Sequence, residues 1–495
     1  MRLSFAVLFS LLPAILATPI QHQGGLAPLS VEGKTIDNSY IIVFKKDITP
    51  AQVAIHLNAV TSLQSAHPLV GGDEGVTQVW APQKMNGFVG YAGKFSEDAL
   101  HEIRKSPEVA YVEMDQIVHT TDDIYGVDDP FEGSAIETQK GAPWGLARIS
   151  HRNRLTLGTF SKYEYNKDGG EGVTAYVIDT GVNIKHVEFE GRARWGKTIP
   201  RNDEDIDGNG HGTHCAGTVG SGKYGVAKKA EIVAVKVLGS NGSGTMADVV
   251  SGVVWAAEDA AKHAAQAARE LALTGRTKFK GSVANMSLGG GKARSLDQAV
   301  DAAVESGLHF AVAAGNDNKD ACDFSPAAAE GAITVGASTV TDQRAYFSNH
   351  GKCVDIFAPG LNIRSTWTGS PTAENTISGT SMASPHICGL LAYLLSIEGT
   401  ETFHLLAGPE EPQELVESPA TVYSEAYKLL PEWAQLILPE PESEDVIELE
   451  RAHFGPKVTP KRLKKALIAL ATPGKLSDLP PSTVNLLAFN NATRS

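Results

Sequence analysis

Three polar side chains stand in stretches of the chain whose residue types could together break an acyl bond. Asp179 ends the apolar run VTAYVID, His211 opens the small-residue stretch HGTHCAGT, and Ser381 lies in SGTSMASPH. A serine hydroxyl is a weak nucleophile until a base accepts its proton, and the base needs an acid to orient it. An acid, a base and a serine in this chain order could therefore supply nucleophilic catalysis.

Each of these residues also has an ordinary structural interpretation. Asp179 before Thr-Gly could cap a turn or a helix, and Ser381 could be only an N-cap. His211 and His214 form a His-x-x-His pair, but no third metal ligand follows at helical spacing. Asn316, at the end of HFAVAAGN, could be a turn residue. The combination, rather than any one residue, favours a catalytic site.

Apolar strands that alternate with helical stretches must position these side chains. Five runs are nearly continuous in apolar residues, which is typical of strands buried on both faces: VTAYVID, EIVAVKVL, SVANMSLG, HFAVAAG and AITVGAS. Helical stretches between them include MADVVSGVVWAAEDAAKHAAQAARELA and LDQAVDAAVESG. This alternation predicts a three-layer α/β domain with a parallel sheet, over about residues 137–495. Active sites in such sheets lie at the carboxyl ends of the strands.

A smaller unit precedes this domain, over about residues 38–120. Its strands are predicted in NSYIIVFKK, FVGYAGKF and VAYVEMD, and its helices in ITPAQVAIHLNAV and SEDALHEIRK. The pattern predicts a small α+β unit. A polar, acidic stretch over about 119–138 follows it without any apolar periodicity, which is typical of an exposed linker that proteases cut.

Composition and charge argue against some classes of function. The 495 residues carry a formal net charge of −14, which argues against binding to nucleic acid. Residues 1–17 have one basic residue and a short apolar core, which is typical of a secretory signal peptide. No later stretch is long and apolar enough to cross a membrane, so we expect a soluble protein of the secretory pathway. Four cysteines allow three full pairings, and the sequence alone does not choose among them.

Most of the negative charge lies in one segment. Residues 401–451 contain 13 acidic and 2 basic residues. This acidic insert, over about 401–455, interrupts the link between the serine-bearing helix and a helix predicted in PKRLKKALIALATPG. A solvated surface segment, an interaction tail and a segment removed after folding all remain open.

The catalytic stretches and two side motifs resemble those of the subtilases. VIDTGV, HGTHCAGT and GTSMASPH match the acid, base and serine motifs of that family, and NMSLGGG and AAGN match its substrate-lining strand and oxyanion motif. The cysteine in HGTHCAGT, with FSNHGKCVDIFAPG and STVNLLAFNN, is similar to the proteinase K branch. The N-terminal unit and the acidic insert look like those of the fungal vacuolar (cerevisin) and alkaline serine proteases, some of which are allergens.

This resemblance implies a serine endopeptidase that is made as a self-processing zymogen. Asp179 would orient the imidazole of His211, which would act as general base and then general acid, while Ser381 would attack the scissile carbonyl. The side chain of Asn316 and the backbone N–H of Ser381 would hold the oxyanion. Residues 18–136 would be a propeptide, with a ferredoxin-like domain that acts as inhibitor and chaperone. A peptide-binding relative without activity and an esterase on the same fold are the alternatives.

The resemblance also implies where a protein substrate would bind. An extended peptide would pair with the strands around NMSLGG and GSNGSG, so its main chain rather than its side chains would be recognised. Specificity should therefore be broad, with aromatic and aliphatic residues accepted at the first pocket. The expected lining residues are Ser287, Leu288, Gly289, Ala313 and Gly315.

One disulfide is a further implication of the resemblance. Cys322 in DACDFSPA and Cys353 in GKCVDIF match a bridge seen in several members of the branch. Cys215 and Cys388 are then expected to be buried thiols that pack as small apolar groups.

Sequons for N-glycosylation occur at Asn241, Asn285 and Asn491. Asn285 leads into the expected substrate strand and should be buried, so it is not a candidate. Asn491, near the end of the sequence, is the favoured site. Asn241 lies in a Gly-rich loop that should border the cleft.

The expected chemistry requires no cofactor, although the resemblance implies a structural calcium ion. Asp355 is the matching carboxylate, with the backbone carbonyls of Glu330 and Ala332. The expected partners are protein substrates and the protein's own propeptide, with neither nucleic acid nor a membrane. The mature protein should be a monomer, in the vacuole or outside the cell.

Overall fold

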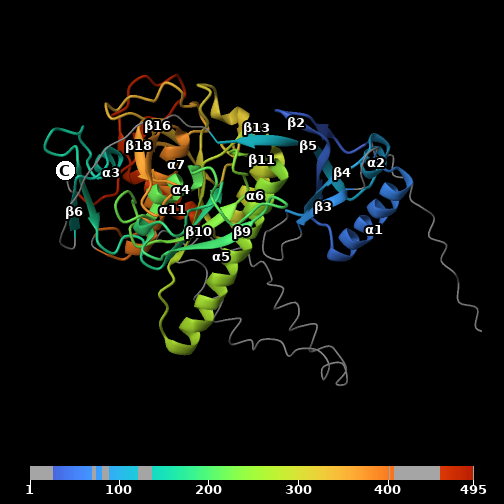
Figure 1. The fold of residues 1–495 in the computed structure, drawn as a ribbon, viewed down its shortest axis with the longest axis horizontal. Coiled ribbons are helices and arrows are strands. Elements are labelled where there is room, and N and C mark those ends of the chain that lie inside the picture. Colours follow the sequence, from blue (N-terminus) through green and yellow to red (C-terminus); the bar gives the residue numbers. More distant parts are fainter. Residues whose placement is uncertain are drawn as a thin grey trace, which may run out of the picture.

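The computed structural model describes residues 26–69, 74–80, 88–120, 136–400, 402–405 and 458–493. Three expectations from the sequence therefore lie outside the described residues, entirely or for the most part. They are the signal peptide (1–17), the linker (119–138) and the acidic insert (401–455). Figure 1 shows a small N-terminal unit that lies beside a larger body.

Within the described residues, a nine-stranded sheet forms the middle layer of the larger body. From edge to edge the strand order is β20-β21-β17-β16-β14-β12-β8-β10-β9. Neighbouring strands run parallel except at one edge, where β20 is antiparallel to β21. The strands are β8 (Val173–Asp179), β9 (Ala193–Thr198), β10 (Glu231–Lys236), β12 (Gly281–Met286), β14 (His309–Ala313), β16 (Ile333–Ser338), β17 (Ile356–Pro359), β20 (Thr472–Pro473) and β21 (Leu486–Leu487).

Helices and short strands complete this body. The helices are α3 (Trp144–Ile149), α4 (His211–Gly220), α5 (Met246–Thr274), α6 (Arg294–Glu305), α7 (Thr380–Ile397) and α11 (Pro460–Leu470). Short strands outside the large sheet are β6 (Ile136–Lys140), β7 (Lys162–Asn166), β11 (Ser243–Thr245), β13 (Gly290–Gly291), β15 (Phe324–Ser325), β18 (Ile363–Thr366) and β19 (Glu374–Ile377).

Two helical layers cover the two faces of the large sheet, as the alternation along β8 demonstrates. Val173, Ala175 and Val177 lie in one hydrophobic cluster with residues of α4 and α7. Tyr176 and Ile178 lie in a second cluster with residues of α5 and α6. Because successive side chains of a strand point to opposite faces, the sheet is buried on both sides. The three-layer α/β fold predicted from the sequence is confirmed.

The helix α7 is the central helix of the first of these two clusters. Among the described helices, it alone has the length and apolar composition to cross a membrane, so the expectation that no later stretch would do so was wrong; all its residues are buried within the protein. Its composition is therefore that of a core helix. Ser381 is the second residue of this helix, so the core of the domain fixes its position.

The N-terminal unit is a small α+β fold, as the sequence predicts. Its strand order is β1-β5-β2-β4-β3, and β11 of the larger body pairs with β5 at the edge of this sheet. The sequence pattern identifies β2, β4, β5 and both helices but misses β1 and β3. The elements are β1 (Leu29–Ser30), β2 (Thr35–Phe44), α1 (Pro50–Ala66), β3 (Gly75–Trp80), β4 (Gly90–Lys94), α2 (Glu97–Ile103) and β5 (Val109–His119).

Candidate active site

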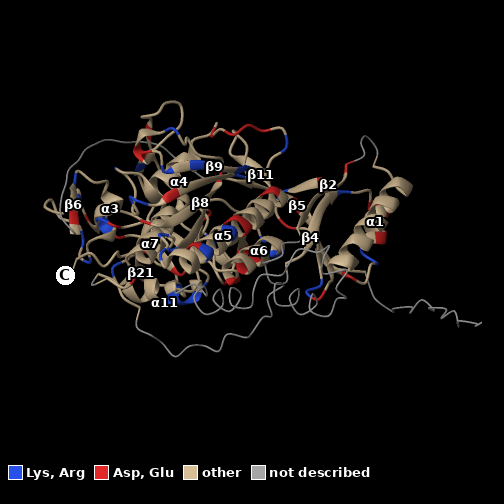
Figure 2. Ribbon diagram, turned by 90° about the horizontal axis from the view of Figure 1, so that it is seen from below, with Lys and Arg blue, Asp and Glu red and all other residues tan. Residues whose placement is uncertain are grey.

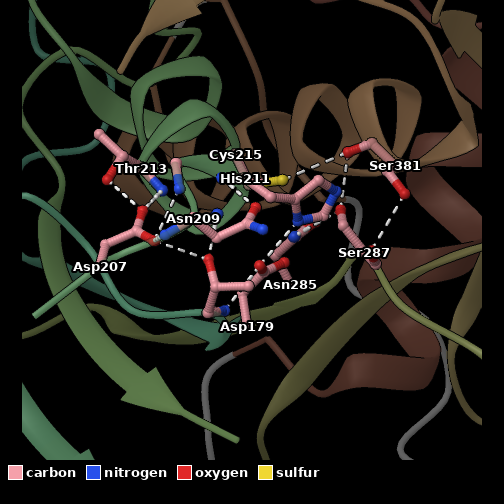
Figure 3. A network of polar contacts seen from close by, with 12 residues as sticks. Asp179, Asp207, Asn209, His211, Thr213, Cys215, Asn285, Ser287 and Ser381 are labelled. Atoms are coloured by element: carbon pink, nitrogen blue, oxygen red, sulfur yellow. Dashed lines mark hydrogen bonds and ion pairs between the residues drawn. The ribbon is translucent and has the colours of Figure 1, made fainter. Parts of the chain in front are cut away.

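A buried acid–base pair lies at the carboxyl end of the central strand β8. Asp179 is the last residue of β8, and His211 is the first residue of α4. The imidazole Nδ1 lies 2.7 Å from Asp179 Oδ1, and both side chains are fully buried. The backbone N–H of Thr180 donates to the same carboxylate oxygen at 2.7 Å. The carboxylate therefore fixes the orientation of the imidazole, which projects toward Ser381 in Figure 3.

A glycine lets α4 approach β8 closely enough for this pair to form. Gly212 follows His211 in the helix, and its N–H donates to Thr180 Oγ1 at 3.0 Å. A Cβ atom at Gly212 would lie 2.1 Å from the carbonyl oxygen of Gly181, which is far inside van der Waals contact. The glycine in HGTH is therefore a requirement of helix–strand packing.

Asp207, which the sequence analysis did not identify, caps the helix that carries His211. Its Oδ1 accepts hydrogen bonds from Thr180 Oγ1 at 2.9 Å and from the Gly210 N–H at 2.8 Å. Its Oδ2 accepts a hydrogen bond from the Thr213 N–H at 2.9 Å. The carboxylate thus satisfies N–H groups at the start of α4, where an acidic side chain is favoured. An aspartate just before the small-residue stretch was the signal that could have revealed it.

The serine hydroxyl and carbonyl both contact Ser287. Ser381 Oγ donates to the carbonyl oxygen of Ser287 at 3.0 Å, and Ser287 Oγ donates to the carbonyl oxygen of Ser381 at 2.7 Å. Cys215 Sγ also contacts the Ser381 carbonyl, at 3.4 Å. The sequence analysis placed Ser381 before the first helical turn, but α7 begins one residue earlier, at Thr380.

Pro385 explains why the Ser381 carbonyl has these partners. In a regular helix the N–H four residues later would donate to this carbonyl, but proline has no N–H. Pro385 lies inside α7, beyond its first turn. The hydroxyl of Ser287 and the thiol of Cys215 therefore take the place of the missing helical donor (Figure 3).

Asn316 lies beside the start of the serine helix. Its Oδ1 accepts hydrogen bonds from the Thr380 N–H at 2.9 Å and from Thr380 Oγ1 at 2.7 Å. The hydroxyl of Thr380 in turn accepts a hydrogen bond from the Gly315 N–H at 3.1 Å. Because the amide oxygen takes both bonds from Thr380, the Nδ2 donor group points away from that residue.

The C-terminal strand of the N-terminal unit lies between two segments of the larger body. β5 pairs antiparallel with β11, with His119 opposite Ser243. The Thr120 N–H donates to the Gly242 carbonyl at 3.0 Å, and the His119 N–H donates to the Gly289 carbonyl at 3.4 Å. An extended segment of the chain therefore lies against both strands that the sequence analysis assigned to substrate.

Two family models match this chain. One, described as the Subtilase family, matches residues 170–427, and the other, described as Peptidase inhibitor I9, matches residues 39–121. The chain belongs to the subtilase family. It is therefore a serine protease with an inhibitory propeptide, and the small N-terminal unit is the domain of the inhibitor type.

Relatives of this subtilase match it over nearly its full length. Subtilisin-like serine protease Pen c 2 of Penicillium citrinum is 50% identical over 507 residues, which cover 98% of this chain and 96% of that protein. Alkaline protease 2 of Aspergillus fumigatus is 50% identical over 504 residues, which cover 98% of this chain and 89% of that protein. The crystal structure of a cold-adapted subtilisin-like serine proteinase is 39% identical, with a TM-score of 0.51, and covers 70% of this chain and 98% of that one.

The residues expected to line the substrate site fall into two groups in the subtilase. Gly289 contacts the propeptide strand through its carbonyl, and Gly315 is half-buried with φ +101°, next to Asn316. Ser287, Leu288 and Ala313 are buried. The side chain of Ser287 supports the backbone of Ser381, so its position is that of a supporting residue.

The cysteines of the subtilase pair as the sequence resemblance implies. Cys322 and Cys353 form a disulfide with an S–S distance of 2.11 Å. Cys215 and Cys388 are buried, and burial raises the pKa of the Cys388 thiol. Both thiols are therefore packed in the core.

A metal at the histidine motif has no support from these contacts. His214 Nε2 lies 2.8 Å from the carbonyl oxygen of Ile363, and burial lowers its pKa to about 3. Possible ligand atoms of Asp179, His211 and Cys215 lie within 4.8 Å of one another. Hydrogen bonds account for this proximity, because Asp179 pairs with His211 and the thiol contacts the Ser381 carbonyl.

The sequons lie in different environments. Asn285 is fully buried, and its amide Nδ2 donates to Ser287 Oγ at 2.9 Å. Asn491 is half-buried, and its Nδ2 donates to the carbonyl oxygen of Thr402 at 2.7 Å. Asn241 is exposed. The environment of Asn491 is thus less suited to a glycan than the sequence analysis expected.

The oxygens expected to bind calcium contact a lysine in the structure. Lys464 Nζ lies 2.9 Å from Asp355 Oδ2, 2.6 Å from the Ala332 carbonyl and 3.1 Å from the Glu330 carbonyl. A divalent cation and an ammonium group cannot share one position. These residues therefore do not fit the calcium ion that the resemblance implies.

Proposed function

We propose that Asp179, His211 and Ser381 form the catalytic triad of this subtilase and that it hydrolyses peptide bonds within proteins. The observation that carries the proposal is the buried 2.7 Å contact between His211 and Asp179, at the strand end that faces the start of α7. The chain order of acid, base and serine is the order found in subtilisin.

In the proposed reaction the hydroxyl of Ser381 leaves the carbonyl of Ser287 and turns to His211. The imidazole accepts the hydroxyl proton as Oγ attacks the scissile carbonyl, and Asp179 stabilises the imidazolium that forms. The imidazolium then donates its proton to the leaving amine, which leaves an acyl-enzyme. Water, activated by the same imidazole, hydrolyses this ester and restores the serine.

The proposed oxyanion site consists of the Nδ2 group of Asn316 and the backbone N–H of Ser381. Thr380 holds the amide oxygen of Asn316 with two hydrogen bonds, which keeps the Nδ2 donor group on the opposite side. The Ser381 N–H lies in the first turn of α7, where the helix dipole favours a negative charge. Both donors are fixed before the substrate binds, which is the condition for strong stabilisation of a transition-state charge.

We propose that substrates bind as an extended strand between β11 and Gly289. The propeptide strand β5 and Thr120, the residue after it, follow this path and make main-chain hydrogen bonds to Gly289 and Gly242. Main-chain pairing does not select side chains, so specificity should be broad. Small residues beside the first pocket, Gly289, Ala313 and Gly315, favour aromatic and aliphatic side chains of the substrate.

The position of the propeptide strand between β11 and Gly289 also supports a self-processing zymogen. The propeptide occupies the substrate site with the strand that leads into the linker over about 119–138, so the linker is the proposed position of self-cleavage. We propose a mature domain over about 137–495. We further propose a monomer of the secretory pathway, located in the vacuole or outside the cell, with Asn241 rather than Asn491 as the glycosylation site.

No cofactor is needed for catalysis by a subtilase, and the proposed steps use only protein groups and water. A structural calcium ion at Asp355, which the resemblance implies, is not part of this proposal because Lys464 contacts the same oxygens.

Replacement of the nucleophile tests the proposed function. The Ser381→Ala variant should remain an uncut precursor and should not digest casein, because no acyl-enzyme can form. Ser378→Ala is a matched control in the same stretch, since the Ser378 hydroxyl contacts Asn362 and not the triad. The control should mature and digest casein at the normal rate. Maturation of purified Ser381→Ala protein, with casein hydrolysis, would disprove the assignment.

A further inference from the structure

Lys464 extends from α11 into a cluster of three oxygens at the N-terminal ends of β16 and β17. The side-chain nitrogen contacts Asp355 Oδ2 at 2.9 Å, the Ala332 carbonyl at 2.6 Å and the Glu330 carbonyl at 3.1 Å. These oxygens come from the segment before β16 and from the residue before β17. The contact therefore joins three segments that are far apart in the sequence.

The three oxygens match the hydrogen-bonding capacity of an ammonium group. A lysine ammonium has three N–H donors, and each oxygen accepts one of them. The side chains of Lys464 and Asp355 are only 21% and 24% exposed, so solvent screens the pair less than it would screen a surface ion pair. Asp355 Oδ2 also accepts a hydrogen bond from the Thr334 N–H at 2.9 Å, which holds the carboxylate toward the cluster.

One carboxylate and two carbonyls are also oxygen donors of the kind that calcium prefers. Calcium takes about 6–8 oxygen ligands, and water supplies those that the protein lacks. Without the ammonium group the cluster would keep a negative charge and two carbonyls that point to one place. The donor set would therefore suit a divalent cation if the lysine were absent.

We propose that Lys464 is a built-in cation that takes the place of a metal ion, and that removal of its ammonium group creates a calcium site. Wild-type protein then needs no calcium at this position. The ammonium cannot dissociate from the protein, so the stability of these strand ends does not depend on the calcium concentration.

Because Lys464 belongs to α11, its ammonium group also holds this helix against the large sheet. α11 follows the acidic insert, and its apolar residues Leu463 and Leu467 are buried in the same hydrophobic cluster as α7. Its sequence PKRLKKALIAL contains four basic and no acidic residues, and Figure 2 shows this blue cluster at α11. Lys464 thus attaches the helix to β16 and β17 independently of the peptide chain between α7 and α11.

Thermal unfolding of the mature enzyme tests the proposal. The enzyme is inactivated with phenylmethylsulfonyl fluoride to prevent self-digestion, and Tm is measured in excess EDTA and in excess CaCl2. Lys464→Ala should lower Tm in EDTA by roughly 4 °C, because a carboxylate loses its partner. Calcium should restore this loss, whereas magnesium should not, because it demands octahedral geometry and dehydrates reluctantly. Lys465→Ala is the matched control, since Lys465 is the exposed neighbour on the same helix.

Calcium binding gives the second readout. Isothermal titration should find one more calcium site per molecule in Lys464→Ala than in wild type or Lys465→Ala. Lys464→Arg, which keeps the positive charge, should behave as wild type. An equal response of Lys464→Ala and Lys465→Ala to calcium and EDTA would overturn the proposal.

Asp355→Asn tests whether Lys464 or calcium occupies the site in the wild-type protein, even if Lys464→Ala does not fold. If wild type binds calcium at this position, Asp355→Asn should abolish a part of the Tm change between EDTA and CaCl2. The proposal instead predicts that this change is the same for wild type and Asp355→Asn. A smaller change in Asp355→Asn would show that calcium, and not Lys464, occupies the site in the wild-type protein.

Discussion

Carboxylates cap helix N-termini in two regions of this subtilase, within the catalytic domain and at its contact with the propeptide. Asp207 caps α4, the helix of His211, and belongs to the same domain as that helix. Glu113 and Asp115 cap α6 and α5, but both come from the propeptide strand β5. The first cap is permanent, whereas the second would leave with the propeptide after the proposed self-cleavage.

At α6 the propeptide supplies a cap that the catalytic domain lacks, whereas at α5 it adds to the domain's own N-cap, Thr245. Glu113 accepts hydrogen bonds from the backbone N–H groups of Arg294 at 2.9 Å and Ser295 at 3.1 Å. The N-cap residue of α6 is Ala293, whose side chain cannot accept a hydrogen bond. Asp115 accepts a hydrogen bond from the Ala247 N–H of α5 at 3.1 Å. At both helix starts, propeptide carboxylates thus accept hydrogen bonds from backbone N–H groups, where negative charge is favoured.

Burial of the two propeptide carboxylates costs desolvation free energy. Burial raises the pKa of Asp115 to about 6, and burial also raises the pKa of Glu113. Their charges are less favourable in the contact than in water, so the hydrogen bonds to the helices offset only part of this cost. The cap of the catalytic helix thus belongs to its own domain, whereas the inhibitory contact uses propeptide carboxylates whose burial costs desolvation free energy.

The largest effect is expected when the permanent cap is changed. Asp207→Asn replaces a carboxylate oxygen with an NH2 group that faces backbone donors. The free energy of unfolding of the catalytic domain should fall by roughly 3 kcal/mol. Urea unfolding in the uncut Ser381→Ala background measures this fall without self-digestion. An unfolding midpoint equal to that of the background protein would show that Asp207 is not the cap described.

Changes in the removable caps should leave the mature enzyme intact. The isolated propeptide with Glu113→Ala and Asp115→Ala should inhibit mature enzyme less strongly, because the helix N–H groups lose their acceptors, with an inhibition constant raised roughly 100-fold, about tenfold for each cap. The mature enzyme contains neither residue, so its Tm and activity against casein are the internal reference. If the double variant inhibits as strongly as the natural propeptide, the helix caps do not contribute to inhibition.

The change of inhibition with pH should be smaller than the effects of Asp207→Asn and of the propeptide double variant. The pKa of Asp115 is about 6 in the contact, above its ordinary value, so the complex binds a proton more readily than the free propeptide does. The complex should therefore gain stability as the pH falls through 6 and lose it as the pH rises. Inhibition should be roughly tenfold stronger at about pH 5 than at about pH 7. This gain should be reduced in Asp115→Asn, and an equal pH dependence of the two propeptides would contradict the argument.

The sequence predicts those parts of the fold and site that depend on local patterns. The continuous apolar run before Asp179 predicts β8, and the small residues after His211 predict a helix packed close to it. The disulfide between Cys322 and Cys353 follows from the family resemblance and is present in the structure.

The sequence does not reveal contacts between residues that are far apart in the chain. Glu113 and Asp115 stand in an ordinary strand pattern, and only the fold brings them to helix ends more than 100 residues away. Lys464 is one of several lysines on a basic helix, so nothing local distinguishes it. Ser287 lies in a motif that predicts a substrate-lining residue. Its hydroxyl instead donates to the Ser381 carbonyl, which Pro385 leaves without a helical donor.

Covalent labelling of the nucleophile tests the central claim most directly. Mature enzyme is treated with a fluorophosphonate, digested, and its modified peptide is identified by mass spectrometry. The label should lie on Ser381 at one per molecule, with loss of activity in proportion, and His211→Ala should greatly slow the reaction. An enzyme that digests casein but is labelled at another residue, or is not labelled at all, would contradict the assignment of Ser381.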